Sequence, residues 1–166
     1  MATNRRTAKK PRHRPALSKQ MLLPLPLPFV RDRSLVAHLA LSSFQSGQGN
    51  QHLLYQLVRT TYLSYLMWSA GVGAGDYQLF CDAEREMESI ASLAAEGGRW
   101  TLNESASSVL ENILCLYDAQ LDCISRSAFL ACQAKLGKLL GMLAVPSGAA
   151  LLGTDQTCKG PLDRQR

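Results

Sequence analysis

The chain has 166 residues, of which 46% are hydrophobic and 19% are charged. This length favours one domain, and the composition excludes a collagen, a wholly disordered chain and a membrane-spanning protein. The net charge of +5 is unevenly distributed: residues 1–33 carry nine basic groups and one acid, whereas residues 34–144 carry six basic groups and ten acids. A basic N-terminal segment therefore precedes an acidic body, which favours a polyanionic partner.

A basic arm occupies residues 1–21. It has no acid, no large aromatic residue and no apolar period, so we expect it to be disordered in the free protein. Its charges are dense enough to neutralise several phosphates without reading bases. The alternative is a solubilising arm that has no partner. The candidate nucleic-acid-binding residues are Arg5, Arg6, Lys9, Lys10, Arg12, Arg14 and Lys19.

A proline-rich strap follows at residues 22–32, where leucine alternates with proline up to Phe29. Proline fixes φ and lacks an amide hydrogen, so we predict an extended conformation. The favoured interpretation is a strap that docks Leu23, Leu25, Leu27 and Phe29 onto the body. The alternative is a ligand for a proline-binding module.

Residues 33–145 are predicted to form a compact all-α bundle of four to five helices, because apolar residues recur there at spacings of three and four. Asn50 and Asp76 are predicted N-caps, and a further helix should begin near Asn103. Residues 146–166 are expected to form a flexible tail. The predicted helices span about 33–44, 50–68, 76–95, 103–124 and 125–143.

The apolar stripes of the last two predicted helices should form the centre of the core. We expect five of their residues to be largely buried: Leu114, Tyr117, Leu121, Leu136 and Leu140. Four of the five cysteines, Cys81, Cys115, Cys123 and Cys132, are predicted to lie on apolar helical faces, where a thiol behaves as a small hydrophobic group. The odd total of five cysteines and their long spacing indicate neither a disulfide framework nor a zinc site, and we expect a cytoplasmic protein.

No motif for catalysis, for a metal or for a cofactor stands out. The acids around Asp82 and Glu88 lie beside an apolar stripe and favour a solvated helical face over a metal site. A second acidic stripe contains Glu111, Asp118 and Asp122. It is predicted to be solvated, and the alternative is a docking surface for a basic partner or for the arm. His38 and His52 are predicted to be structural.

Gly49-Asn50-Gln51, followed by a helix and then by Thr60-Thr61-Tyr62-Leu63, resembles the entry to a Fis-type helix-turn-helix. However, no glycine marks a turn there and no basic residue follows Arg59 before Trp68. We therefore predict one helix from Gln51 to Met67, with at least two of the residues Tyr62, Tyr65 and Trp68 in the core.

A broader resemblance covers about residues 24–140 and rests on Pro26-Leu27-Pro28, on Ser34-Leu35 with His38-Leu39-Ala40-Leu41, and on Gly47 with Gly49-Asn50. These residues resemble a set of short, uncharacterised proteobacterial proteins that are labelled Fis-family transcriptional regulators. The resemblance implies a bacterial, cytoplasmic protein, and it supplies no catalytic residues.

The sequence thus favours a non-enzymatic helical binding protein, without a cofactor or metal, whose arm contacts nucleic acid or another polyanion. Two alternatives remain. One is a helical protein–protein adaptor or homo-oligomer that does not bind nucleic acid, and the other is a Fis-like DNA-binding regulator. No membrane association is expected.

Overall fold

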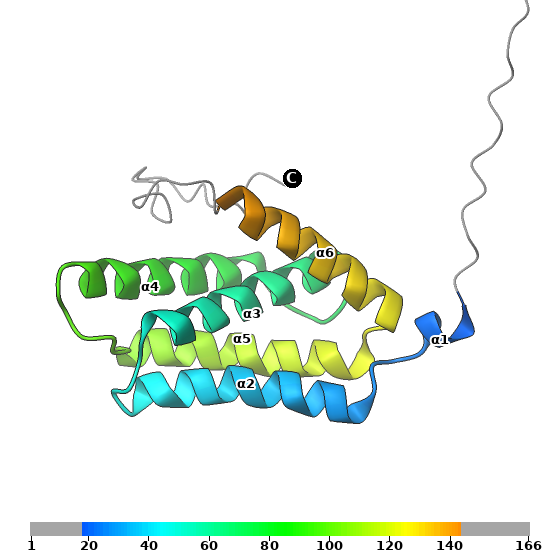
Figure 1. The fold of residues 1–166 in the computed structure, drawn as a ribbon, viewed down its shortest axis with the longest axis horizontal. Coiled ribbons are helices and arrows are strands. Elements are labelled where there is room, and N and C mark those ends of the chain that lie inside the picture. The colour runs from blue at the N-terminus through cyan, green and yellow to red at the C-terminus, as the bar shows by residue number, and fades with distance from the viewer. Residues whose placement is uncertain (1–17, 144–166) are drawn as a thin grey trace, which may run out of the picture.

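The computed structural model describes residues 18–143, and every regular element within them is an α-helix (Figure 1). The predicted all-α fold is confirmed. The predicted count of four to five helices is low for this part of the chain, because a one-turn helix precedes the five long ones. The arm up to residue 17 and the tail from residue 144 lie outside the described residues. The helices are α1 Lys19–Leu22, α2 Leu27–Gln45, α3 Gln51–Ser69, α4 Tyr77–Ala95, α5 Glu104–Cys123 and α6 Arg126–Leu143.

The segment predicted as an extended strap over residues 22–32 is helical over much of its length, so this prediction is corrected. Only the residues between Leu22 and Leu27 lie outside helices, and α2 already begins at Leu27. Pro26 is the N-cap of α2 and Pro28 lies in its first turn. Proline is tolerated there because the first helical amides have no intrahelical acceptor. Proline spacing alone therefore could not distinguish an extended strap from a helix start.

Docking of the same segment is confirmed for half of the predicted side chains. Leu25 and Phe29 are half-buried and pack against the core, whereas Leu23 and Leu27 are exposed. The Phe29 ring meets the ring of Phe129 in α6 edge to face, with centroids 5.4 Å apart. The amide of Arg126 donates to the carbonyl of Leu23 at 2.9 Å. These contacts fix the N-terminal segment beside the start of α6.

The helix starts follow the predicted caps. The side chain of Asn50 accepts from the Leu53 amide at 3.0 Å, and Asp76 accepts from the Gln78 amide at 3.2 Å. Asn103 caps α5 in the same way. A cap of this kind satisfies an amide that has no partner within the helix, so the polar residues before each apolar stripe locate the helix starts.

Helix α3 lies at the centre of the bundle, in contact with α2, α4, α5 and α6 (Figure 1). All residues from 61 to 67 are buried, so this part of α3 has no solvent-exposed face. The helix continues through Thr60 without a turn, and both Tyr62 and Tyr65 are in the core. The prediction of one continuous helix is therefore confirmed, and the segment lacks the turn that a helix-turn-helix requires.

The predicted core is also confirmed for most of its residues. Leu114, Tyr117, Leu121 and Leu136 are at most 3% exposed, and Leu140 is half-buried against the same cluster. The cysteines are less uniform than predicted. Cys132 is buried, but Cys115 and Cys123 are exposed, which corrects their placement on apolar faces. Helical periodicity alone does not show whether a small residue at the edge of an apolar stripe is buried or exposed.

Candidate functional site

The predicted nucleic-acid-binding residues are only partly visible. Lys19 lies in α1, where its side chain is exposed. The other six, between Arg5 and Arg14, lie outside the described residues. Helix α1 packs on α6, so the chain enters the described fold beside the first turn of α6. The charges of the helices next to this entry point determine whether the arm is part of a larger charged surface.

Charge in the described helices is divided by element. Helices α1, α2, α3 and α6 together carry seven basic side chains and one acid, whereas α4 and α5 carry eight acids and one basic side chain. We call the first group the basic face, since its helices are neighbours: α6 packs on α1 and α3, and α3 packs on α2. Its basic residues are Lys19, Arg31, Arg33, Arg59, Arg126, Lys135 and Lys138.

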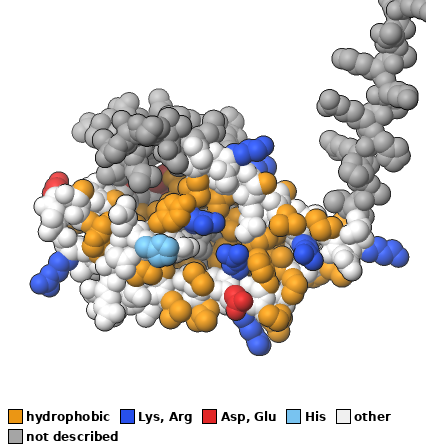
Figure 2. Space-filling view, in the orientation of Figure 1, with side chains coloured by type: hydrophobic (Ala, Val, Ile, Leu, Met, Phe, Trp, Pro, Cys, Tyr) orange, Lys and Arg blue, Asp and Glu red, His pale blue; other side chains and the backbone are white. Residues whose placement is uncertain are grey.

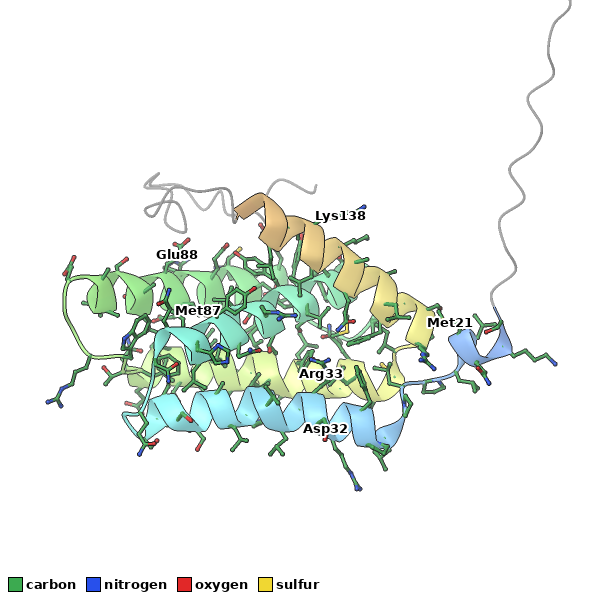
Figure 3. All side chains as sticks on the ribbon, viewed as in Figure 1. Met21, Asp32, Arg33, Met87, Glu88 and Lys138 are labelled. Carbon is green, nitrogen blue, oxygen red and sulfur yellow. The ribbon has the colours of Figure 1, made fainter. Side chains whose placement is uncertain are left out.

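Figure 2 shows Lys and Arg side chains spread over this side of the molecule, with few acidic side chains among them. In Figure 3, Lys138 points outward from α6, and Arg33 lies on the side of α2 that faces α3. Asp32, the one acid of the group, lies on the opposite side of α2 (Figure 3). The body, acidic as a whole, thus presents a basic surface on the side where the arm begins.

A polar groove opens in this face between α2, α3 and α6. Arg33 and Arg59 line it from neighbouring helices, and Gln133 lines it from α6. The buried ring of Tyr117, from α5, also lines it. Burial raises the pKa of Tyr117 to about 12, and Asp118 also raises it, whereas the positive charges of Arg33 and Arg59 lower it. Arg33, Arg59 and Tyr117 thus line the same groove.

The raised pKa of Tyr117 predicts a dependence of stability on alkaline pH. Because the folded-state pKa, about 12, exceeds the usual value of about 10, the folded state holds the phenolic proton more tightly. The stabilisation is complete below about pH 10 and is lost as the pH rises through the folded pKa. We expect Tyr117→Phe to reduce the fall in unfolding free energy between pH 8 and pH 11 by about 1.4 kcal/mol.

This difference is measured by urea unfolding of both proteins at the two pH values. Tyr62, whose pKa burial also raises, is present in both proteins, so the comparison isolates Tyr117. Equal pH dependence of wild type and variant would show that the Tyr117 hydroxyl is not protected by burial.

Two acids of the α5 stripe contact α2, but Glu111 and Asp122 are exposed as predicted and only Asp118 is half-buried. Nε2 of His38 lies 2.8 Å from Oδ2 of Asp118. Nε2 of Gln45 donates to Glu111 at 2.7 Å and to Oγ of Ser107 at 2.7 Å. These bonds tie two neighbouring helices along their length. Sequence reasoning missed the His38–Asp118 pair because 80 positions separate its members.

The His38–Asp118 pair lies at the edge of a second, wider groove that also contains Ser34. Within the described residues, no hydroxyl group is hydrogen-bonded to His38. A histidine held by a carboxylate from a neighbouring helix serves here to position α2 on α5. The prediction of a structural histidine agrees with this geometry.

The acids of α4 are likewise engaged with neighbouring groups. The Tyr62 hydroxyl donates to Glu84, Arg85 pairs with Asp82 at 2.9 Å, and Ser105 donates to Glu86 at 3.2 Å. Among residues 18–143, no group of three or more His, Cys, Asp or Glu side chains is placed to hold a metal ion. No helix in the same part of the chain is long and apolar enough to cross a membrane.

Comparison with known proteins adds no relative: no family model, no curated protein sequence and no solved structure matches the chain.

Proposed function

We propose that this chain is a non-enzymatic, cytoplasmic helical protein that binds nucleic acid or another polyanion without sequence preference. The binding surface consists of the basic arm together with the basic face of α1, α2, α3 and α6. The observation that carries the proposal is the division of charge by helix, with the basic helices on the side where the arm begins.

The net negative charge of the body argues against binding to a phosphate backbone, and the division of charge between helices answers this objection. A net negative body repels a phosphate backbone only if its acids lie near that backbone, because salt at about 0.1 M screens charges beyond about 10 Å. The acids are concentrated on α4 and α5, and several of them are bonded to neighbouring side chains. Helix α6 carries Arg126, Lys135 and Lys138 and no acid. A duplex lying along α6 and the arm would therefore meet mainly positive groups.

Deletion of residues 1–17 tests the proposal and leaves α1 intact. Each basic group that neutralises a phosphate contributes about 0.9 to the slope of log affinity against log salt. Removal of the six basic residues of this segment should lower that slope by up to about 5 for a short DNA duplex. The measurement is fluorescence anisotropy over a series of salt concentrations. The melting temperature should stay nearly unchanged, since the buried core begins at Val30.

A full-length control, in which the same six residues are replaced by glutamine, separates charge from chain length and should behave like the deletion. Equal binding by the full chain and the deletion at about 50 mM salt, or binding by neither, would overturn the proposal.

A second candidate function, a helical protein–protein adaptor, is favoured by the outer side of α2. Leu27, Leu35 and Leu39 are 57%, 57% and 55% exposed there. Exposed leucines repeated along one helix are typical of a surface that packs against another chain. This function does not need the arm, so binding to a protein partner that survives the deletion of residues 1–17 would favour it.

A further inference from the structure

The groove between α2, α3 and α6 is lined by two arginines, and each of them lies over an aromatic ring of its own helix. The guanidinium of Arg33 lies 5.1 Å from the ring centre of Phe29, and that of Arg59 lies 5.8 Å from the ring centre of Tyr55. In both cases the aromatic residue precedes the arginine by four positions, one helical turn. An aromatic ring covers one flat side of each guanidinium, and the N–H groups at its edge stay available for an oxyanion.

Neither charge is neutralised within the described part of the chain. No carboxylate oxygen there lies within 4 Å of Arg33 or Arg59, and each guanidinium lies against an aromatic ring. Asp118, the acid that acts on Tyr117 together with them, is bonded to His38. Two like charges that line one groove repel each other, so an anion between them would relieve a cost present in the empty groove.

The lining of the groove suits an oxyanion. The amide side chains of Gln56 and Gln133 and the hydroxyl of Tyr117 add neutral donors, while Leu63 and Leu136 form an apolar wall. The space measures about 40 Å³, several times the volume of about 10–15 Å³ that one water molecule requires. Charged donors next to an apolar wall bind an anion more strongly than donors in open water.

We propose that this groove binds one phosphate group, with Arg33 and Arg59 as the charged donors. This inference rests on the proposed function, because it assumes that the phosphate belongs to a nucleic-acid backbone. A phosphate group on its own has the same chemistry, and the experiment separates the two sources.

The test compares three double variants of the full chain. Arg33→Gln with Arg59→Gln removes both charged donors. Arg33→Lys with Arg59→Lys keeps the charge and loses the planar fork. Arg85→Gln with Arg99→Gln is the matched control, because it removes two positive charges from α4 and from the connection that follows it. The probes are a short DNA duplex, followed by anisotropy, and inorganic phosphate, followed by NMR of the arginine Nε–H groups.

The glutamine pair should weaken duplex binding by about tenfold at about 0.1 M salt and lower the salt slope by about 1, because the groove neutralises one phosphate. The lysine pair keeps both positive charges and should keep most of the slope, but it should bind the duplex more weakly than wild type, because a lysine cannot offer the bidentate fork. The control pair should bind like wild type. In wild type, inorganic phosphate should shift the signals of Arg33 and Arg59 saturably.

The outcomes separate this inference from the proposed function. If the duplex binds through the arm, but the glutamine pair behaves like the control and phosphate shifts neither arginine signal, the groove is not a phosphate site and the proposed function stands. If phosphate binds saturably at the two arginines while the duplex does not bind, the groove is a site for a free phosphate group and the proposed function fails.

Discussion

Leu121→Ala is expected to lower the free energy of unfolding by about 2–5 kcal/mol, the usual range for a buried leucine. Leu121 is 0% exposed and lies in α5, which packs on α2, α3 and α4. Truncation therefore leaves a cavity bordered by side chains from several helices, and no single helix can move to fill it. Urea unfolding, followed by circular dichroism, measures the change.

Leu93→Ala is the matched control, since Leu93 is 55% exposed on α4. The same truncation there should change stability by no more than about 0.5 kcal/mol. If Leu121→Ala costs less than about 1 kcal/mol, α5 does not bury this face in solution. A loss of cooperativity instead of a shifted midpoint would mean that Leu121 also selects one packing arrangement among several.

The helical architecture was predictable because local signals agree along the chain. Apolar stripes at spacings of three and four, together with cap residues such as Asn50, Asp76 and Asn103, located the long helices. The start of α2 was not predictable from the same signals. Pro26 and Pro28 indicate an extended strap by composition, yet the first turn of a helix accepts proline equally well. In the structure the segment is helical, and Phe29 packs against Phe129, far away in the sequence.

The sequence predicted one part of the candidate site, the basic arm. It did not predict that the basic surface continues onto the helical bundle. The basic residues of the body are scattered through the sequence from Arg31 to Lys138 and show no local cluster. They share one side of the molecule only because α6 folds back onto α3 and α1. The same limit applies to Arg33 and Arg59: each follows an aromatic residue by four positions, but the groove between them is a product of how α2 packs on α3.

Gln120 is a buried polar residue in α5, and its role depends on contacts with residues that are distant in the sequence. It is 0% exposed. The Ser64 hydroxyl donates to its Oε1 at 2.8 Å, and its Nε2 donates to the carbonyls of Ser64 and Val72, both at 3.0 Å. The side chain thus joins α5 to the middle of α3 and to the connection between α3 and α4. Sequence periodicity could not identify these partners, because Ser64 and Val72 are distant from Gln120 in the sequence.

Gln120→Leu should lower the free energy of unfolding by about 2–4 kcal/mol, although leucine has nearly the same size. The substitution leaves the Ser64 hydroxyl and the Val72 carbonyl without their buried partner, and each unsatisfied group costs about 1–3 kcal/mol. Gln48→Leu, at an exposed position in the loop before α3, is the matched control and should change stability by no more than about 0.5 kcal/mol. Urea unfolding of each variant measures these differences.

A double-mutant cycle with Ser64→Ala shows whether the cost arises from unpaired polar groups. Ser64→Ala alone leaves Oε1 of Gln120 buried without its donor, whereas the double variant removes both partners of this bond. The double variant should therefore cost less than the sum of the two single variants, by about 1 kcal/mol or more. Strict additivity would mean that the two side chains do not interact in solution, and the cost of Gln120→Leu would then reflect packing alone. Coupling of the expected size would identify this buried bond as one of the contacts that fix α5 against α3.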